Sequence, residues 1–361
     1  MWPKKTKKIS LAILAVAALA ALLLAIRLST SHSDSARAEL LRFVPADATS
    51  VIFVDLDQLR TSPFLATIYS WAPPSAEDAD YTKFVNDTGF NYERDLAQVF
   101  LAVSNHGGSS STLVVADGRF DRRKIEAYLG RNSAPAQQAN LKIFSIPAWI
   151  RDKSIFFSFL SDHRIAIADS ENLAALLSAA KHESAHAEWQ TRFDRLAGSP
   201  LLVIFRQDPT VQAVLASESP QLASLVERLP WITLAGKPNG NFLQLVVEGE
   251  SPSDAMASQL SEFLRGLQLL AQNGLNDPQL RQRMNPDERN AYVELLKGAQ
   301  IDKIGRGDLK SVRVVLPLTP QFLRIAKAPT LLTAPDTAAD PPPAAAKNKT
   351  VPPQAKPTKR K

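Results

Sequence analysis

A short apolar pattern that occurs twice constrains the fold of this 361-residue chain more than any other feature. Val51-Ile52-Phe53 and Val203-Ile204-Phe205 are each followed by an aspartate within three residues and then by a helical pattern. Runs of β-branched and aromatic residues are typical of buried strands. The recurrence indicates that one folding unit is present twice.

Each copy continues with a predicted β-hairpin and an amphipathic helix. Glycines occupy both hairpin turns, and glycine readily takes the positive φ that tight turns need. Helical spacing of the apolar residues then predicts the helix. The predicted strands are 98–104, 112–117, 231–236 and 242–249, and the predicted helices are 120–129 and 254–270.

The order of these elements is that of a split βαβ unit. The sequence therefore predicts an α+β protein with two tandem β-α-β-β-α-β (ferredoxin-like) repeats and mainly antiparallel sheets. The first repeat is expected over residues 45–197 and the second over residues 198–327.

A run of eighteen uncharged residues, from Ile9 to Ile26, precedes the repeats. At about 1.5 Å per residue such a helix spans roughly 27 Å, close to the thickness of the hydrocarbon core of a lipid bilayer. Four lysines before it and only Arg27 after it place the N-terminus inside. We expect a cytoplasmic stub and single-pass transmembrane anchor over residues 1–27, a spacer over residues 28–44 and an extracytoplasmic, periplasmic body. A cleaved signal peptide is the alternative.

The net charge of +6 belongs to the two ends of the chain. Residues 1–27 hold +5 and residues 328–361 hold +4, which leaves the body at −3. A nucleic-acid site needs a basic patch on the folded part, so we predict no nucleic-acid partner. The tail, residues 328–361, is rich in Pro, Ala and Lys and is predicted to be disordered. Its basic end could bind anionic envelope polymers.

One segment resembles a catalytic motif, and no cysteine exists to supply thiolate chemistry. His182-Glu183-Ser184-Ala185-His186 fits H-E-x-x-H, in which two histidines on one helical face bind Zn²⁺ and the glutamate acts as general base. The resemblance to zinc metallopeptidases covers only these five residues, and the family's third ligand does not follow at its usual spacing. We predict no catalytic, cofactor or metal site, with a zinc site at His182, Glu183 and His186 as the alternative.

Asp55 and Asp57 lie where the first predicted strand ends. The two-residue period of a strand would place both carboxylates on one face, as a pair for acid–base chemistry. The simpler interpretation, which we favour, is that they end the strand and cap the next helix.

Residues 44–47, the strand at 51–56 and the run Gly118-Arg119-Phe120-Asp121 are similar to a loose pattern in uncharacterised bacterial membrane-anchored envelope proteins. That resemblance implies an extracytoplasmic α+β body without a known activity, and it carries over no functional residue. The predicted function is a membrane-anchored binding or scaffolding protein of the cell envelope. The alternative is a membrane-tethered zinc hydrolase.

Overall fold

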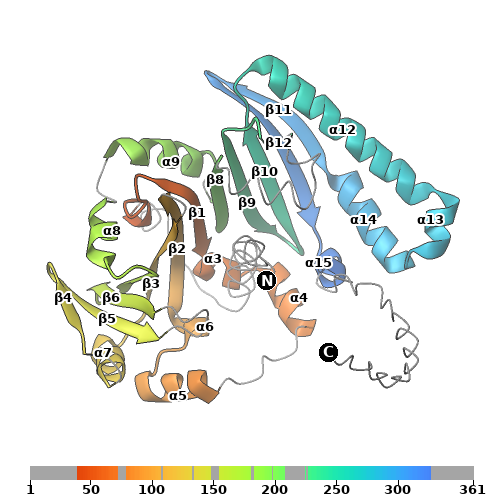
Figure 1. The fold of residues 1–361 in the computed structure, drawn as a ribbon. Helices are drawn as coiled ribbons and strands as arrows, with labels where there is room; N and C mark the ends of the chain where they lie inside the picture. The colour runs from red at the N-terminus through yellow and green to blue at the C-terminus, as the bar shows by residue number, and fades with distance from the viewer. Residues whose placement is uncertain are drawn as a thin grey trace, which may run out of the picture.

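The structure is a computed structural model, and it describes residues 39–71, 79–106, 109–131, 134–147, 154–179, 183–196, 198–207, 224 and 227–326 (Figure 1). The predicted anchor, the tail at 328–361 and His182 lie outside the described residues. The strands are β1 (Ala48–Asp55), β2 (Leu96–His106), β3 (Ser109–Gly118), β4 (Ala136–Gln138), β5 (Leu141–Pro147), β6 (Ser154–Ser161), β7 (Arg164–Ala168), β8 (Leu201–Arg206), β9 (Trp231–Asn239), β10 (Phe242–Glu250), β11 (Gln300–Arg306) and β12 (Leu309–Leu318). The helices are α3 (Leu56–Arg60), α4 (Pro63–Trp71), α5 (Ala79–Thr88), α6 (Tyr92–Asp95), α7 (Arg122–Gly130), α8 (Leu173–Ala179), α9 (Glu183–Arg195), α12 (Asp254–Asn276), α13 (Pro278–Arg283), α14 (Pro286–Gly298) and α15 (Pro320–Ala326).

All twelve described strands form one antiparallel sheet, in the order β11-β12-β10-β9-β8-β1-β2-β3-β7-β6-β5-β4. The repeated apolar pattern lies at its centre, because β1 pairs with β8 and places Val51 opposite Ile204 and Ile52 opposite Val203. Both strands are apolar on both faces, which suits strands that are covered on each side.

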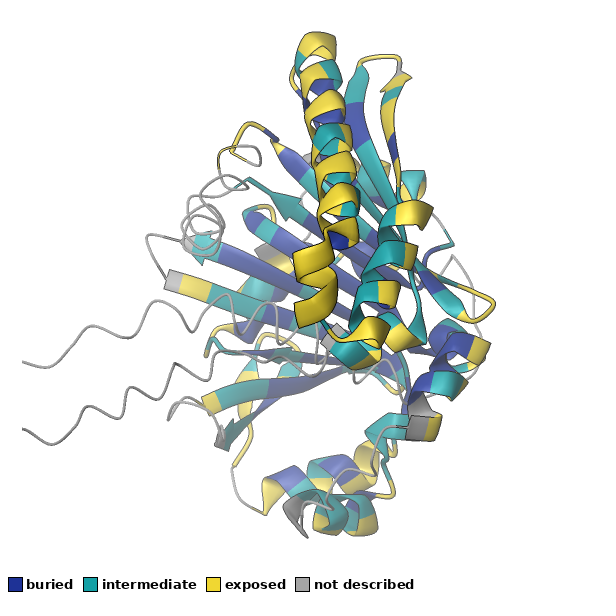
Figure 2. Ribbon diagram, turned by 90° about the vertical axis from the view of Figure 1, so that its right-hand side faces the viewer, coloured by how far each residue is buried: buried dark blue, intermediate teal, exposed yellow. Residues whose placement is uncertain are grey.

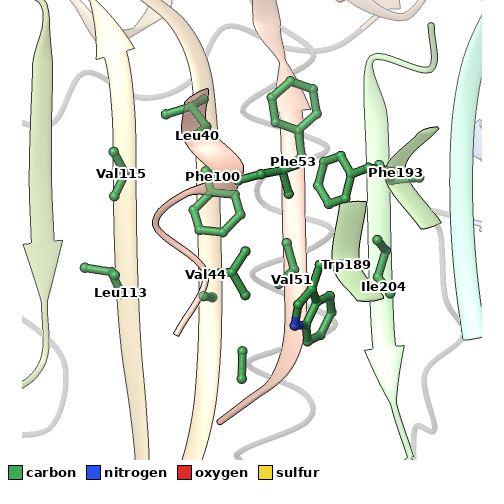
Figure 3. Close-up of a cluster of buried hydrophobic side chains, with 14 of the residues drawn as sticks. Leu40, Val44, Val51, Phe53, Phe100, Leu113, Val115, Trp189, Phe193 and Ile204 are labelled. Atoms are coloured by element: carbon green, nitrogen blue, oxygen red, sulfur yellow. The ribbon is translucent and has the colours of Figure 1, made fainter. Parts of the chain in front are cut away.

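The alternation of side chains along β1 separates two cores on the two faces of the sheet. Val51 and Phe53 point into one core with Phe100, and helices α8 and α9 cover it with residues 40–44 (Figure 3). Ile52 and Val54 point into the other core, which α3, α4 and α7 cover. Helix α12 forms a smaller third cluster on β11 and β12.

The prediction of two ferredoxin-like repeats is wrong. Each half has the same strand order, β1-β2-β3-β7-β6 in the first and β8-β9-β10-β12-β11 in the second, but every pairing is antiparallel. In a split βαβ unit the helix returns the chain to a parallel strand. Here β2 lies antiparallel beside β1 after the intervening helices, and the β1–β8 pairing joins both halves into a single sheet.

The prediction of a single-pass membrane protein is also contradicted. Across the described ranges, no helix combines the length and the apolar character needed to cross a bilayer. The longest one, α12, has 23 residues but alternates apolar with polar residues, including Glu262 and Arg265. The segment on which that prediction rested, Ile9–Ile26, is not among the described residues. The prediction that the body of the chain lies outside the cytoplasm depended on that anchor and is withdrawn with it.

Two glycines, one at the end of β3 and one at the end of α7, give a matched test of packing. A Cβ on Gly118 would lie 2.5 Å from the backbone oxygen of Asp95, whereas a Cβ on Gly130 would meet nothing within 4 Å. We expect Gly118→Ala to lower the free energy of unfolding by about 1–3 kcal/mol, the usual effect of overpacking. Gly130→Ala, within α7, should raise it by about 0.5–1 kcal/mol. Urea denaturation of both variants checks this, and equal effects would contradict the close approach at Gly118.

Candidate functional site

The candidate site lies where the C-terminal half of α9 crosses the ends of β9, β10 and β12. Along α9, Trp189 and Phe193 are one helical turn apart and both are fully buried against the sheet. Phe193 packs edge-on against Phe53, with ring centroids 6.0 Å apart. Anchored in this way, the helix carries Arg192 and Arg195 over the strand ends.

The sheet contributes two glutamates to the same place. Glu248 and Glu250 are two residues apart on β10, so both side chains point to the α9 face. The register places Arg313 of β12 directly opposite Glu248. Its Nε and Nη2 donate to Glu248 Oε2 at 2.9 and 2.6 Å.

The helix arginines complete a network of ion pairs. Arg192 Nη2 donates to Glu250 Oε2 at 2.6 Å, and Arg195 Nη2 donates to Glu250 Oε1. Arg195 Nη1 lies 3.2 Å from Glu248 Oε1, within ion-pair distance but without the geometry of a hydrogen bond. The Glu248 side chain is only 1% exposed, so its charge depends on these arginines. Three arginines face two glutamates, an excess of one positive charge.

Two tryptophans form the wall beside the network. The ring of Trp231 meets that of Trp189 edge to face, with centroids 4.9 Å apart. The guanidinium carbon of Arg192 lies 3.7 Å from the centroid of Trp231, and that of Arg206 lies 4.7 Å from it. Such stacking holds the planar guanidinium against the face of the ring and removes part of its hydration. Burial lowers the pKa of Arg192, and the hydrogen bond to Glu250 opposes that shift.

Several buried polar atoms around the network lack hydrogen-bond partners among the described residues. They are Trp189 Nε1, Arg192 Nε, Thr233 Oγ1, Ser311 Oγ and Glu248 Oε1, which has the ion pair with Arg195 but no hydrogen bond. The strand register places Thr233 opposite Glu248 and Ser311 opposite Glu250. Because unpaired buried polar groups are costly, a concentration of them on one patch is typical of a site that receives a polar group.

A cavity of about 290 Å³ opens at this network. We call it the arginine cleft. Its lining residues are Thr191, Arg192, Arg195, Pro230, Glu250, Ser251, Asp308, Leu309 and Lys310. This volume lies at the lower end of ligand sites, so it suits one small group and not a large cofactor.

The zinc motif is only partly placed by the structure. Helix α9 begins at Glu183, so His186 lies in it, while His182 is outside the described residues and the side chains of Glu183 and His186 are not described. Within the part of the chain that is described, no three His, Asp or Glu side chains gather as metal ligands. The absence of a metal site therefore stays a prediction, and the zinc site at His182, Glu183 and His186 stays its alternative.

The interpretation of Asp55 as a helix cap is confirmed. Asp55 is the N-cap of α3, and its carboxylate accepts a hydrogen bond from the backbone N of Gln58 at 2.8 Å and from Gln98 Nε2 at 2.9 Å. For Asp57 the same interpretation is wrong, because this residue lies within α3 and pairs with Arg60 at 2.5 Å. Each carboxylate is therefore committed to a structural contact.

No protein-family model matches this chain, and no curated protein matches it. Among solved structures it is similar to crystal form IV of TP0453, with 12% identity and a TM-score of 0.42 over 80% of this chain and 95% of that one. Crystal forms III and I of TP0453 are 11% identical, each with a TM-score of 0.39. At these values the likeness carries no argument about this chain. The resemblance to envelope proteins stays a prediction.

Proposed function

We propose that this chain is a binding or scaffolding protein that accepts an anionic group of its ligand in the arginine cleft. The observation that carries the proposal is the set of unpaired buried polar atoms beside a network with one excess positive charge. Of the residues that hold these atoms, Arg192 lines the cleft, and its Nε can only donate a hydrogen bond. A ligand group that satisfies this atom must supply an acceptor, as a carboxylate or a phosphate does.

Binding fits the cleft better than catalysis does. Arginine stays protonated near neutral pH and so neither takes up nor releases a proton in a reaction. The arginines are held by glutamates and by Trp231, an arrangement that orients planar donors. Preorganised donors of this kind are suited to recognising a carboxylate or a phosphate.

Calorimetric titration of the full chain with inorganic phosphate and with succinate tests the proposal. We expect heat of binding for at least one of the two anions, and the stronger binder identifies the group. Arg192→Gln should weaken that binding at least tenfold, about 1.4 kcal/mol. Lys310→Gln, which changes the rim of the cleft, should weaken it less.

Arg131→Gln is the matched control. Arg131 also pairs with a carboxylate, Asp87, at 2.7 Å and also lies over an aromatic ring, that of Tyr128 at 5.8 Å, but it is remote from the cleft. It should bind anions as the wild type does. No heat with either anion, or equal affinity in Arg192→Gln and the wild type, would contradict the proposed function.

A further inference from the structure

The hydroxyl groups that line the arginine cleft already donate their protons within the protein. Thr191 Oγ1 donates to the backbone oxygen of Ala187 at 2.8 Å, and Ser251 Oγ donates to that of Ser253 at 2.9 Å. A hydroxyl has one proton to donate, so neither side chain donates to a ligand unless it gives up its present bond. The donors for an anion must therefore come from the charged side chains.

The terminal nitrogens of both cleft arginines are also engaged by the protein itself. Arg192 donates from Nη1 to the backbone oxygen of Glu188 and from Nη2 to Glu250, each at 2.6 Å, whereas its Nε has no acceptor among the described residues. Arg195 directs Nη1 at Glu248 and Nη2 at Glu250. The paired terminal nitrogens with which an arginine holds a phosphate in bidentate fashion are thus occupied.

Two side chains of opposite charge line the rim of the cleft. Lys310 donates one of its three protons to the backbone oxygen of Gly307 at 2.5 Å. Asp308 lies in the exposed turn between β11 and β12 (Figure 2). The charges of Lys310 and Asp308 cancel, so the cleft keeps the excess of one positive charge that the network gives it.

This charge sum favours a ligand with a single negative charge. One negative charge neutralises the excess, whereas a second one would leave unbalanced negative charge beside Glu250. The Glu250 side chain is 12% exposed, so water screens that repulsion less than it would at the protein surface.

The rest of the lining is apolar. Pro230 and Leu309 contribute it, and the cavity of about 290 Å³ leaves room for a small ligand only. An apolar wall beside a few charged groups suits a ligand that has a short hydrocarbon part and one polar end.

We propose that the ligand of the arginine cleft is a small aliphatic monocarboxylate, and that Glu250 sets this specificity by disfavouring dianions. The inference rests on the proposed function and narrows its anionic group to a single carboxylate. The carboxylate binds at Arg192, and the hydrocarbon part packs against Pro230 and Leu309. A carboxylate has two oxygens and one charge, which matches the few free donors and the charge sum better than a phosphate dianion does.

Calorimetric titration of the full chain with butyrate, succinate and inorganic phosphate tests the inference. Butyrate and succinate have the same number of carbon atoms, but butyrate ends in a methyl group where succinate has its second carboxylate. We expect butyrate to bind about tenfold more tightly than succinate, which enters through one carboxylate, and phosphate to bind most weakly.

Two variants test the part played by the negative charges of the cleft. Glu250→Gln keeps an oxygen for the arginines but adds one to the charge sum, so it should shift the preference about tenfold towards succinate and phosphate. Asp308→Asn should shift it in the same direction by a smaller factor, and it leaves the buried network intact. Glu188→Gln is the matched control, because Glu188 is an exposed, paired glutamate outside the lining of the cleft, and its preference should equal that of the wild type.

The outcomes separate this inference from the proposed function. A wild type that binds succinate or phosphate more tightly than butyrate overturns the inference and leaves the proposed function standing. A wild type that binds none of the three overturns both. An unchanged preference in Glu250→Gln, with the fold verified by circular dichroism, overturns the role of Glu250, and if that variant does not fold, an unchanged preference in Asp308→Asn overturns the charge argument.

Discussion

Replacing Glu248 with alanine is expected to lower the free energy of unfolding by about 3–5 kcal/mol, the usual cost of removing one partner from a buried ion pair. Glu248 is 1% exposed and is shared by Arg313 and Arg195. Without it, Arg313, whose side chain is 22% exposed, loses both of its hydrogen bonds to Oε2, and Arg195, whose side chain is 13% exposed, keeps only Glu250 as an ion-pair partner. Chemical denaturation, with two-state behaviour checked by two probes, measures the loss.

Glu188→Ala is the control for this prediction. Glu188 pairs with Arg206 at 2.6 Å, but its side chain is 56% exposed, so its loss should cost less than about 1 kcal/mol. Replacing Glu248 and Arg313 together by leucine should recover much of the stability, because the unpaired charge disappears with its partner. A loss below 1 kcal/mol in Glu248→Ala would show that the network does not support the fold.

Trp189→Ala should lower the free energy of unfolding by about 3–5 kcal/mol through the cavity it leaves. The indole is fully buried between α9 and the sheet and holds Trp231 edge to face. Its loss should also loosen the stack of Arg192 on Trp231. Denaturation curves give the energy, and the change in tryptophan fluorescence that is absent when Trp231 is also replaced by phenylalanine reports the surroundings of Trp231.

Trp189→Phe provides the comparison. A phenyl ring retains most of the buried apolar contact, and Trp189 Nε1 has no hydrogen-bond partner among the described residues, so no hydrogen bond within them is lost. We expect it to cost less than half as much as alanine. Equal destabilisation by both substitutions would mean that the indole nitrogen, and not the packing, holds α9 in place.

The strands and their hairpins follow from local residue patterns. The strands predicted at 98–104 and 112–117 are the β2–β3 hairpin, and the helix predicted from Asp254 is α12. The order of the strands in the sheet cannot be predicted in this way, because apolar periodicity identifies a strand but does not show which strand pairs with it. In particular, the pairing of the repeated patterns at Val51 and Val203 with each other depends on contacts 150 residues apart in sequence.

The candidate site could not be predicted from the sequence for a related reason. The arginines of α9, the glutamates of β10 and Arg313 of β12 come together only through the sheet register. One local signal exists: Glu248 and Glu250 share a strand face with Val246, which packs against the core. Charges at core-facing positions of a strand indicate buried partners.

The NMR signal of the Arg192 Nε–Hε group in the full chain tests the central claim most directly. This atom is buried and lacks an acceptor among the described residues. If the arginine cleft binds an anionic group, added phosphate or succinate should shift the signal and slow its exchange with water, while the Arg131 signal stays in place. An Arg192 signal that does not move at saturating concentrations of either anion would contradict the account.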